Sequence, residues 1–346
     1  MRIQVNARNR GFQFDAGTAE TVLYAGLGAG IELPYECATG TCGTCKAKVV
    51  DGRVSDVWPE APGRKYLKSA NERLMCQCVA ETDAIIEIPA YVNSAAQGSC
   101  RPAFTEGRLR APALLAHDVM SFGIDLPDAC EFDAGQFVAV AAEGVPGYRA
   151  YSMVNYQRGA KRLEFVVKRK PDGGFSQWLF GAARDGAPLR VFGPLGKATY
   201  YPALAKNVLC IAGGSGVAGM ISILTCAVNE GALEAHRAWL FFGVRTSTDV
   251  FHLEALSRLC ERCPDRLAVT VALSDELVPA ALADRWPRLG FSQGLVHEVA
   301  RNAMAGDYRD VRAYVAGPPP AVDAALRMLL LEAKLTADNI RYDKFS

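Results

Sequence analysis

The sequence predicts three domains: short strands around one helix, then an antiparallel β-barrel, then a doubly wound α/β domain. Three observations support this fold class. A length of 346 residues suffices for two to three domains of about 150 residues each. Strand patterns dominate the first two thirds of the chain, whereas strands and helices alternate from Asn207 onward. Residues 93–100 are small and polar, as in a linker. We therefore expect domains at 1–92, 101–203 and 204–346.

Apolar alternation and turn signals predict the elements of each domain in order. In the first domain we expect strands at 3–5, 12–14, 47–50 and Ala84–Ile88, and a helix at 21–29. In the second we expect strands at 119–126, Phe137–Ala142, 149–154 and 163–167, and a helix at 177–180. In the third we expect strands at 208–212, 239–243, Leu267–Leu273 and 311–316. The helical stretches between these last strands imply a parallel sheet covered on both faces.

Composition excludes several classes of protein. Hydrophobic residues make up 50% of the chain, which excludes a disordered protein. The net charge is +1, so we expect no nucleic-acid partner. The uncharged run from Asn207 to Asn229 is long enough to cross a bilayer, but the glycines at 213–216 interrupt it, and we expect no membrane partner. No apolar secretory segment follows the N-terminus, so we expect reduced cysteines in a cytoplasmic protein.

The strongest motif is a C-x4-C-x2-C run followed by a distant cysteine. Its members are Cys37, Cys42, Cys45 and Cys76. This spacing is typical of plant-type [2Fe–2S] sites, whereas zinc sites usually pair two short C-x2-C units. Gly40 and Gly43 lack a Cβ, so the backbone N–H groups can approach the sulfurs.

The other seven of the 11 cysteines carry no comparable pattern. Cys78 competes with Cys76 as the fourth ligand, because both would point to the same face of a strand, but the spacing favours Cys76. Cys260 and Cys263 form a lone C-x2-C that we interpret as structural. The remaining bystanders are Cys100, Cys130, Cys210 and Cys226.

A second group of motifs indicates a flavin site in the barrel. Arg149, Tyr151 and Ser152 end one expected strand: an arginine can neutralise a phosphate, a tyrosine can stack on an isoalloxazine, and a serine can bond a flavin nitrogen. The next segment opens a helix whose N–H groups suit a pyrophosphate, and it comprises Gly173, Gly174, Phe175 and Ser176. Gly193 begins a Gly-Pro-Leu-Gly run at a later strand end.

Two glycine-rich loops lie at strand ends of the third domain, where nucleotides bind in doubly wound sheets. The first comprises Gly213, Gly214, Ser215 and Gly216; the second comprises Gly317, Pro318 and Pro319. The first loop alone is a weak signal, because it does not match the G-x-G-x-x-G pattern.

The order of these motifs closely resembles the NADH-dependent reductase components of multicomponent bacterial oxygenases, over essentially the whole chain. The resemblance implies a β-grasp ferredoxin domain, an antiparallel β-barrel FAD domain and an NAD(H)-binding α/β domain of the ferredoxin–NADP reductase superfamily. It implies that the four motif cysteines hold a [2Fe–2S] cluster, with Cys37 and Cys42 on one iron. It also implies that the barrel motifs, Gly193 included, bind FAD, and that the two glycine-rich loops face NADH.

The resemblance further implies electron flow from NADH through FAD and the cluster, one electron at a time, to an oxygenase directly or through its ferredoxin. We expect Tyr151 on one flavin face, Ser152 at the ring and Phe345 as a shield on the other face, in a monomeric protein. Residues 54–63 and the tail 340–346 look like those of toluene monooxygenase reductases, which serve diiron hydroxylases. A Rieske-type dioxygenase, a deoxysugar dehydratase and a redox-sensing role without turnover remain alternatives.

The chain departs from the family's pattern at two positions. Ala316 stands where the family usually carries a cysteine, and Gly219 where its glycine-rich loop continues to a proline. Both departures bear on the pose of the nicotinamide and the rate of hydride transfer. The segment 243–249 lacks the pattern that binds the 2′-phosphate of NADPH, so NADH is favoured. Arg245 leaves NADPH as an alternative. The four histidines are scattered, and we interpret them as structural or surface groups: His117, His236, His252 and His297.

Overall fold

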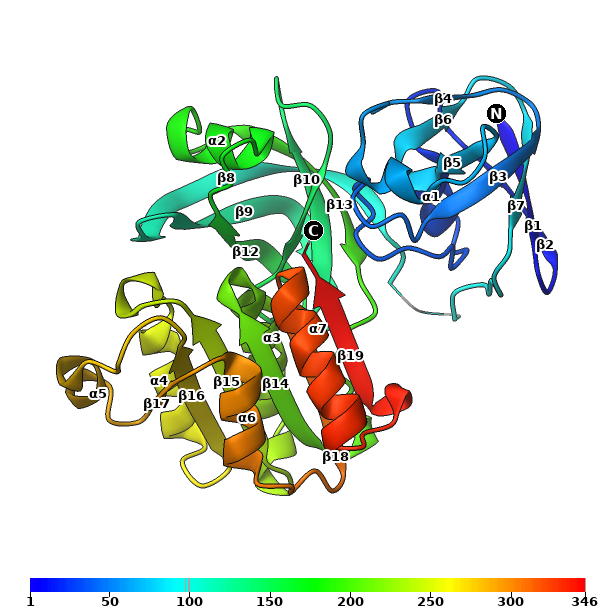
Figure 1. Cartoon of the computed structure of the whole chain (residues 1–346). Helices are drawn as coiled ribbons and strands as arrows, with labels where there is room; N and C mark the ends of the chain where they lie inside the picture. Colours follow the sequence, from blue (N-terminus) through cyan, green and yellow to red (C-terminus); the bar gives the residue numbers. More distant parts are fainter. Residues whose placement is uncertain (97, 99, 346) are drawn as a thin grey trace.

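The structure is a computed structural model that describes residues 1–96, 98 and 100–345. Gln97 and Ser99 of the expected linker, and Ser346 of the tail, lie outside the described residues. Three main sheets follow one another along the chain, in the order that the sequence predicts (Figure 1).

The first sheet is mixed, with strand order β2-β1-β7-β3-β5, and packs against a single α-helix. The strands are β1 (Arg2–Ala7), β2 (Gly11–Asp15), β3 (Lys46–Asp51), β5 (Glu72–Leu74) and β7 (Ala84–Ile88), with a separate pair of β4 (Val54–Asp56) and β6 (Cys78–Ala80). The helices are α1 (Val22–Gly28) and the 3₁₀ turns η1 (Pro62–Tyr66) and η2 (Met75–Gln77). Alternate residues of β1, Ile3 and Val5, are fully buried, which is the period expected of a half-buried strand.

The second sheet is antiparallel and curled, with strand order β11-β10-β13-β8-β9-β12. Its elements are β8 (Ala103–Ala116), β9 (Val119–Cys130), β10 (Phe137–Ala142), β11 (Arg149–Ser152), β12 (Ala160–Lys168), α2 (Gly174–Gly181) and β13 (Pro188–Leu195). The two edges approach each other where the N–H of Val154, just after β11, donates to the carbonyl of Glu164 in β12 at 2.8 Å. The long strand β8 escaped the sequence analysis because much of it is exposed and its apolar residues do not alternate cleanly.

The third sheet is parallel, with strand order β17-β16-β15-β14-β18-β19. Its elements are β14 (Asn207–Gly213), α3 (Val217–Asn229), β15 (Ala238–Val244), α4 (Leu253–Arg262), β16 (Leu267–Leu273), α5 (Ala280–Arg285), β17 (Gly290–Gln293), α6 (Val296–Met304), β18 (Val311–Gly317), α7 (Pro319–Arg327) and β19 (Ile340–Lys344). Short turns are η3 (Pro202–Leu204), η4 (Gly214–Gly216), η5 (Ala232–Glu234), η6 (Ser247–Asp249), η7 (Met328–Glu332) and η8 (Ala337–Asn339). The edge strands β17 and β19 were not expected from the sequence, because both are short and only partly buried.

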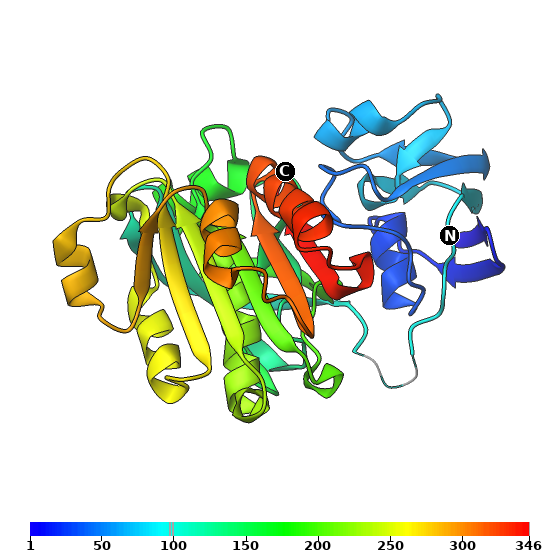
Figure 2. The same cartoon turned by 60° about the horizontal axis from the view of Figure 1, so that its bottom comes forward.

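The chain order reverses between β14 and β18, which is where ligands bind in open α/β sheets. The curled sheet lies over the carboxyl ends of the parallel strands, and the first domain lies beside it (Figures 1 and 2). The last strand, β19, brings the C-terminus back to the junction of the domains. In the described part of the chain, no helix combines the length and apolar character that a membrane span requires.

Candidate functional site

The four motif cysteines converge at one place in the first domain. Cys37, Cys42 and Cys45 lie on the loop before β3, and Cys76 lies in η2. The Sγ atoms of Cys45 and Cys76 are 3.2 Å apart and both side chains are buried, whereas Cys37 and Cys42 are half-buried. Three thiols on one loop and a fourth from another segment make a ligand set that fits a [2Fe–2S] cluster.

Backbone N–H groups surround the sulfur of Cys37. Those of Thr39, Thr41 and Cys42 donate to it at 3.4, 3.3 and 3.4 Å, and that of Thr44 donates to the Cys42 sulfur at 3.5 Å. A hydrogen bond from the Cys42 thiol and these N–H groups lower the pKa of Cys37 to about 4, while the pKa of Cys42 is raised. The loop is therefore organised to hold negative charge on sulfur, as a metal-binding thiolate requires.

Glycines occupy the positions where this loop packs too closely against its neighbours to leave room for a side chain. Gly40 and Gly43 have positive φ angles of 91° and 77°. A Cβ on Gly43 would lie 2.5 Å from the ring of Tyr66, and one on Gly63 would lie 2.9 Å from the Gly40 carbonyl oxygen. The N–H of Gly63 donates to that oxygen at 2.8 Å, so η1 covers the loop.

Cys78, the competing candidate, points into the core of the first domain from β6. Among the described thiols, the sulfur contacts within the motif join Cys45 to Cys76 and Cys37 to Cys42, and none includes Cys78. All eleven cysteines are free thiols in the described chain, so the odd total requires no disulfide partner.

The barrel motifs meet around Tyr151. Its ring centroid lies 5.3 Å from that of Phe175, which is in the first turn of α2 and directly precedes Ser176. The Ser176 hydroxyl accepts from the Lys170 N–H at 3.1 Å and donates to the Gly173 carbonyl at 3.0 Å. This hydroxyl therefore holds the turn that presents the helix N-terminus, and the N–H groups of that first turn are the ones available to an anion.

Ser152 connects the barrel with the nucleotide domain. It is buried, and a Cβ on Gly219 in α3 would lie 3.7 Å from its Cβ and 3.9 Å from its Oγ. Gly219, one of the two departures from the family's pattern, therefore faces the expected flavin strand. Because those distances are ordinary van der Waals contacts, the position can accept a small side chain.

The two glycine-rich loops lie against each other at the reversal point of the sheet. A Cβ on Gly216 would come within 2.4 Å of the Ala316 carbonyl oxygen, and one on Gly317 within 2.9 Å of the Gly213 carbonyl oxygen. Gly214, with φ +53°, faces open space. The two backbones therefore approach closely at the edge of the sheet where dinucleotide phosphates bind in folds of this kind.

Other expected residues lie at the same edge. Phe345 is half-buried, and its N–H donates to the Gly317 carbonyl at 2.9 Å. Arg245 directly follows β15, the strand next to β14, so it also lies at the carboxyl edge. The structure thus brings together Tyr151, Ser152, both glycine-rich loops and Phe345, which are far apart in the sequence.

Arg149 lies differently from the other barrel residues. Its guanidinium stands over the ring of Trp58, 5.2 Å from the centroid, and donates to the Tyr148 carbonyl at 2.9 Å. The side chain therefore spans the junction with the first domain. Gly193 lies near the end of β13, at the start of the Gly-Pro-Leu-Gly run, and pairs with Ala103 of β8.

Sequence reasoning missed the residues that join the first domain to the barrel. The Tyr35 hydroxyl accepts from the Gly196 N–H at 3.0 Å, and the ring of Tyr24 stacks on Phe192 with centroids 4.1 Å apart. In the sequence, Tyr24 looks like a core residue of an apolar helix and Tyr35 like a loop residue, so no signal indicated a contact between domains for either.

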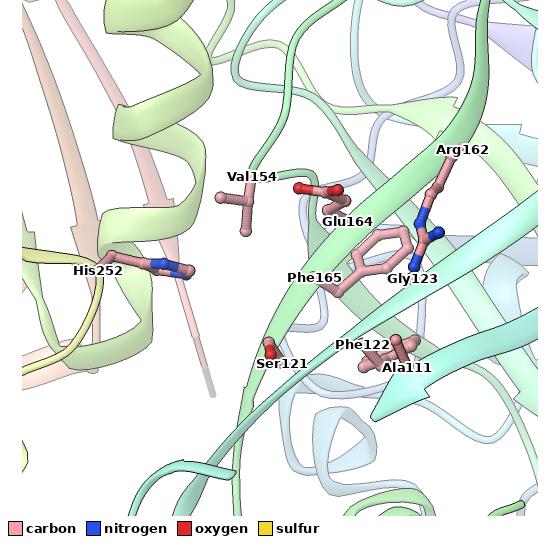
Figure 3. Close-up of a pocket in the computed structure, with 9 residues that line it drawn as sticks. All are labelled: Ala111, Ser121, Phe122, Gly123, Val154, Arg162, Glu164, Phe165 and His252. Atoms are coloured by element: carbon pink, nitrogen blue, oxygen red, sulfur yellow. The ribbon is translucent and has the colours of Figure 1, made fainter. Parts of the chain in front are cut away.

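Two of the histidines, His252 and His117, lie between the barrel and the nucleotide domain. A cavity of about 200 Å³ between the barrel and the nucleotide domain is lined by His252, Arg162, Glu164 and Ser121 among others, none of which belongs to the expected cofactor sites (Figure 3). Burial lowers the pKa of His252 to about 4, so its imidazole is neutral at pH 7. His117 in the β8–β9 hairpin lies 3.7 Å from Asp249 of the nucleotide domain.

Comparisons with known proteins agree with this arrangement. Three family models match in succession: "2Fe-2S iron-sulfur cluster binding domain" at residues 5–81, "Oxidoreductase FAD-binding domain" at 106–200 and "Oxidoreductase NAD-binding domain" at 210–327. A ferredoxin–NAD(P)(+) reductase, CarAd, of Metapseudomonas resinovorans is 34% identical, with 95% of each chain covered.

Two further curated relatives belong to monooxygenase systems. The ferredoxin–NAD(+) reductase component of the alkene monooxygenase system of Xanthobacter autotrophicus is 32% identical, covering 97% of this chain and 99% of that protein. The xylene/toluene monooxygenase electron transfer component XylA of Pseudomonas putida is 31% identical, covering 93% and 87%. Among solved structures, the ferredoxin reductase in carbazole 1,9a-dioxygenase has a TM-score of 0.84 at 32% identity, covering 100% of this chain and 99% of that one.

Proposed function

The chain belongs to the family of ferredoxin–NAD(P) reductase components of multicomponent oxygenases, and from this premise we propose that it oxidises NADH and delivers single electrons to an oxygenase or to its ferredoxin. The observation that carries the proposal is the contact path between the three matched domains. The Arg149 guanidinium of the barrel stands over the Trp58 ring of the first domain, and Ser152 of the barrel faces Gly219 of the nucleotide domain.

When bound, FAD would accept a hydride and release its electrons one at a time, and the cluster would carry them singly. The chain's own residues determine where these groups lie. We assign Cys37, Cys42, Cys45 and Cys76 to the cluster. We assign Tyr151 and Ser152 to the flavin ring, the first turn of α2 to its pyrophosphate, and the loops at 213–216 and 317–319 to NADH. The position of Phe345 beside Gly317 supports its assignment as a shield over the ring.

We place the domain boundaries at 1–92, 101–203 and 204–346; the three family matches fall inside these ranges. NADH is favoured over NADPH because Arg245 is the only basic residue in the segment 243–249. We assign the protein to the cytoplasm, because eleven free thiols suit a reducing compartment, and we expect a monomer.

The test begins with an absorption spectrum of the purified protein. Flavin bands and a broad cluster shoulder, both bleached by NADH, are expected, together with steady reduction of cytochrome c. A colourless protein would contradict the proposal. Steady turnover with NADH would eliminate a redox-sensing role without turnover.

The acceptor is proposed to be a diiron aromatic or alkene monooxygenase. The relatives from xylene/toluene and alkene monooxygenase systems support this choice, whereas the likeness to a reductase of carbazole dioxygenase supports the Rieske alternative. Product formation with purified hydroxylase, Rieske dioxygenase or deoxysugar dehydratase components would discriminate among the three.

A further inference from the structure

Tyr24 links the cluster loop to the flavin barrel, at the junction where the Tyr35 hydroxyl also accepts from the Gly196 N–H. It lies in α1 and only 2% of its surface is exposed. Its hydroxyl donates to the Ala38 carbonyl at 3.1 Å, one residue beyond Cys37. Its ring stacks on Phe192 of β13 at an interplanar angle of 16° and meets Tyr148 edge-on at 5.6 Å. One side chain therefore contacts the cluster loop at its polar end, and with its ring contacts β13 and the residue just before β11 of the barrel.

The contact falls on a part of the loop that has little freedom. Ala38 has a φ angle of 57°, which is uncommon for a residue with a Cβ. Its conformation aims the next N–H groups, those of Thr39 and Thr41, at the Cys37 sulfur. The Tyr24 hydroxyl satisfies the carbonyl of this strained residue in a buried place where no water competes, so the bond stabilises the loop conformation.

Tyr24 lies in a core cluster that continues from the first domain into the barrel, where it includes Phe192 and Leu195. Within this cluster the Tyr24 ring stacks directly on the Phe192 ring of the barrel. The stack adjoins Gly193 and the strand of Arg149, both assigned to the flavin site. Aromatic stacking of this kind adds an orientation preference to the area that it buries.

We propose that Tyr24 is a positioning residue that sets the distance and orientation of the iron–sulfur cluster relative to the flavin, and so sets the rate of electron transfer between them. This inference rests on the proposed function, because it assumes that both groups are present. Electron tunnelling falls steeply with distance, so a small displacement of the loop is enough to slow it. The Tyr24 hydroxyl holds the cluster loop, and the Tyr24 ring holds the first domain against the barrel. Substitutions can remove the hydroxyl alone or the hydroxyl together with the ring.

The experiment uses the full-length protein loaded with FAD and cluster. Stopped-flow mixing with NADH separates reduction of the flavin from the later bleaching of the cluster. We expect flavin reduction at the wild-type rate in Tyr24→Phe and Tyr24→Leu. We expect cluster reduction to slow about threefold in Tyr24→Phe, which keeps the stack, and tenfold or more in Tyr24→Leu, which loses both contacts.

Phe104→Leu is the matched control, because Phe104 belongs to the same ring cluster but donates no bond to the loop. Electron paramagnetic resonance of the reduced cluster and the iron content provide readouts independent of turnover. A changed signal at full iron content in both Tyr24 variants supports positioning. Cluster reduction at the wild-type rate in Tyr24→Leu, or equal slowing in Phe104→Leu, would overturn it.

If Tyr24→Leu loses iron, Tyr24→Phe becomes the deciding variant, because it removes only the hydroxyl group. Wild-type cluster reduction and an unchanged signal in that variant would then contradict the proposal. Failure of the proposed function would look different: NADH would not bleach the flavin even in the wild-type protein.

Discussion

The cluster loop and the nucleotide edge are built in opposite ways. Three of the four thiols come from a single nine-residue run, 37–45, and that run's own N–H groups solvate the sulfurs. The nucleotide edge draws instead on β11, α2, two strand ends of the parallel sheet and the C-terminal tail. Local geometry therefore specifies the first site, whereas packing between segments that are distant in the chain specifies the second.

This difference explains why mutations should act differently in the two places. In the loop, loss of one ligand removes a bond that nothing else can replace. At the nucleotide edge, the chain contributes mainly backbone, so side-chain changes act by altering how closely two segments approach.

The largest effect is expected from the cluster ligands. Cys76→Ser, like Cys37→Ser, Cys42→Ser or Cys45→Ser, should abolish reduction of cytochrome c while NADH still reduces the flavin at the wild-type rate. The reason is that a cluster held by four thiolates loses one of them. Cys78→Ala is the matched control and should retain iron and activity. If Cys78→Ala lost the cluster and Cys76→Ser kept it, our choice of the fourth ligand would be wrong.

A smaller but still large effect is expected at Gly216. Gly216→Ala would bring a Cβ within 2.4 Å of the Ala316 carbonyl oxygen, so the two loops must separate. We expect kcat/KM for NADH to fall about tenfold or more, with the iron content unchanged. Gly219→Ala, three residues on, has ordinary contact distances and should change the same ratio less than about twofold. Equal losses in both variants would mean that the packing of the loops is not decisive.

A few-fold effect is expected from Ala316→Cys. Ala316 is the last residue but one of β18, lies against Gly216 and is 3% exposed, and the family resemblance places a cysteine there. We expect the rate of flavin reduction by NADH to rise about twofold to fivefold, because the larger side chain would constrain the nicotinamide's pose. Ala313→Cys places a thiol on the same strand but in a different core cluster, and should leave that rate unchanged. Pre-steady-state reduction measured at the flavin band would decide.

The smallest effect concerns pH and the tail. Burial, with repulsion from Glu36, raises the pKa of half-buried Asp343 to about 7; Lys344 and Tyr35 are its other titratable neighbours. Between about pH 4 and pH 7 the folded state thus binds more protons than the unfolded state, so stability falls as pH rises. Asp343→Asn should remove this slope and raise Tm by about 2–4 °C at pH 8, with no change near pH 4.

Thermal melts at both pH values would measure this effect, and Asp338→Asn, at an exposed carboxylate of η8, is the control. An unchanged Tm at pH 8 in Asp343→Asn would show that ionisation of Asp343 does not destabilise the folded state.

The same contrast governs how much could be predicted. Local apolar patterns predicted several elements that the structure confirms. They are the helix expected at 21–29 and the strands Ala84–Ile88, Phe137–Ala142 and Leu267–Leu273. The strands β8, β17 and β19 were missed because exposed or short strands leave a weak pattern. The role of Ser176 as the hydroxyl that holds a turn also depends on a backbone conformation that the residue type does not reveal.

By itself, the sequence determined the cysteine set, the three-domain order and the family, because each depends on residue types at short spacing along the chain. Only the tertiary structure decided which segments touch: Tyr24 on Phe192, Arg149 on Trp58, Gly216 on Ala316 and Phe345 on Gly317. The first three contacts join residues that are 91 to 168 positions apart, and Phe345 lies 28 positions after Gly317. Spacing in the chain carries no information about these contacts, because close packing between distant segments, rather than local backbone preference, selects them.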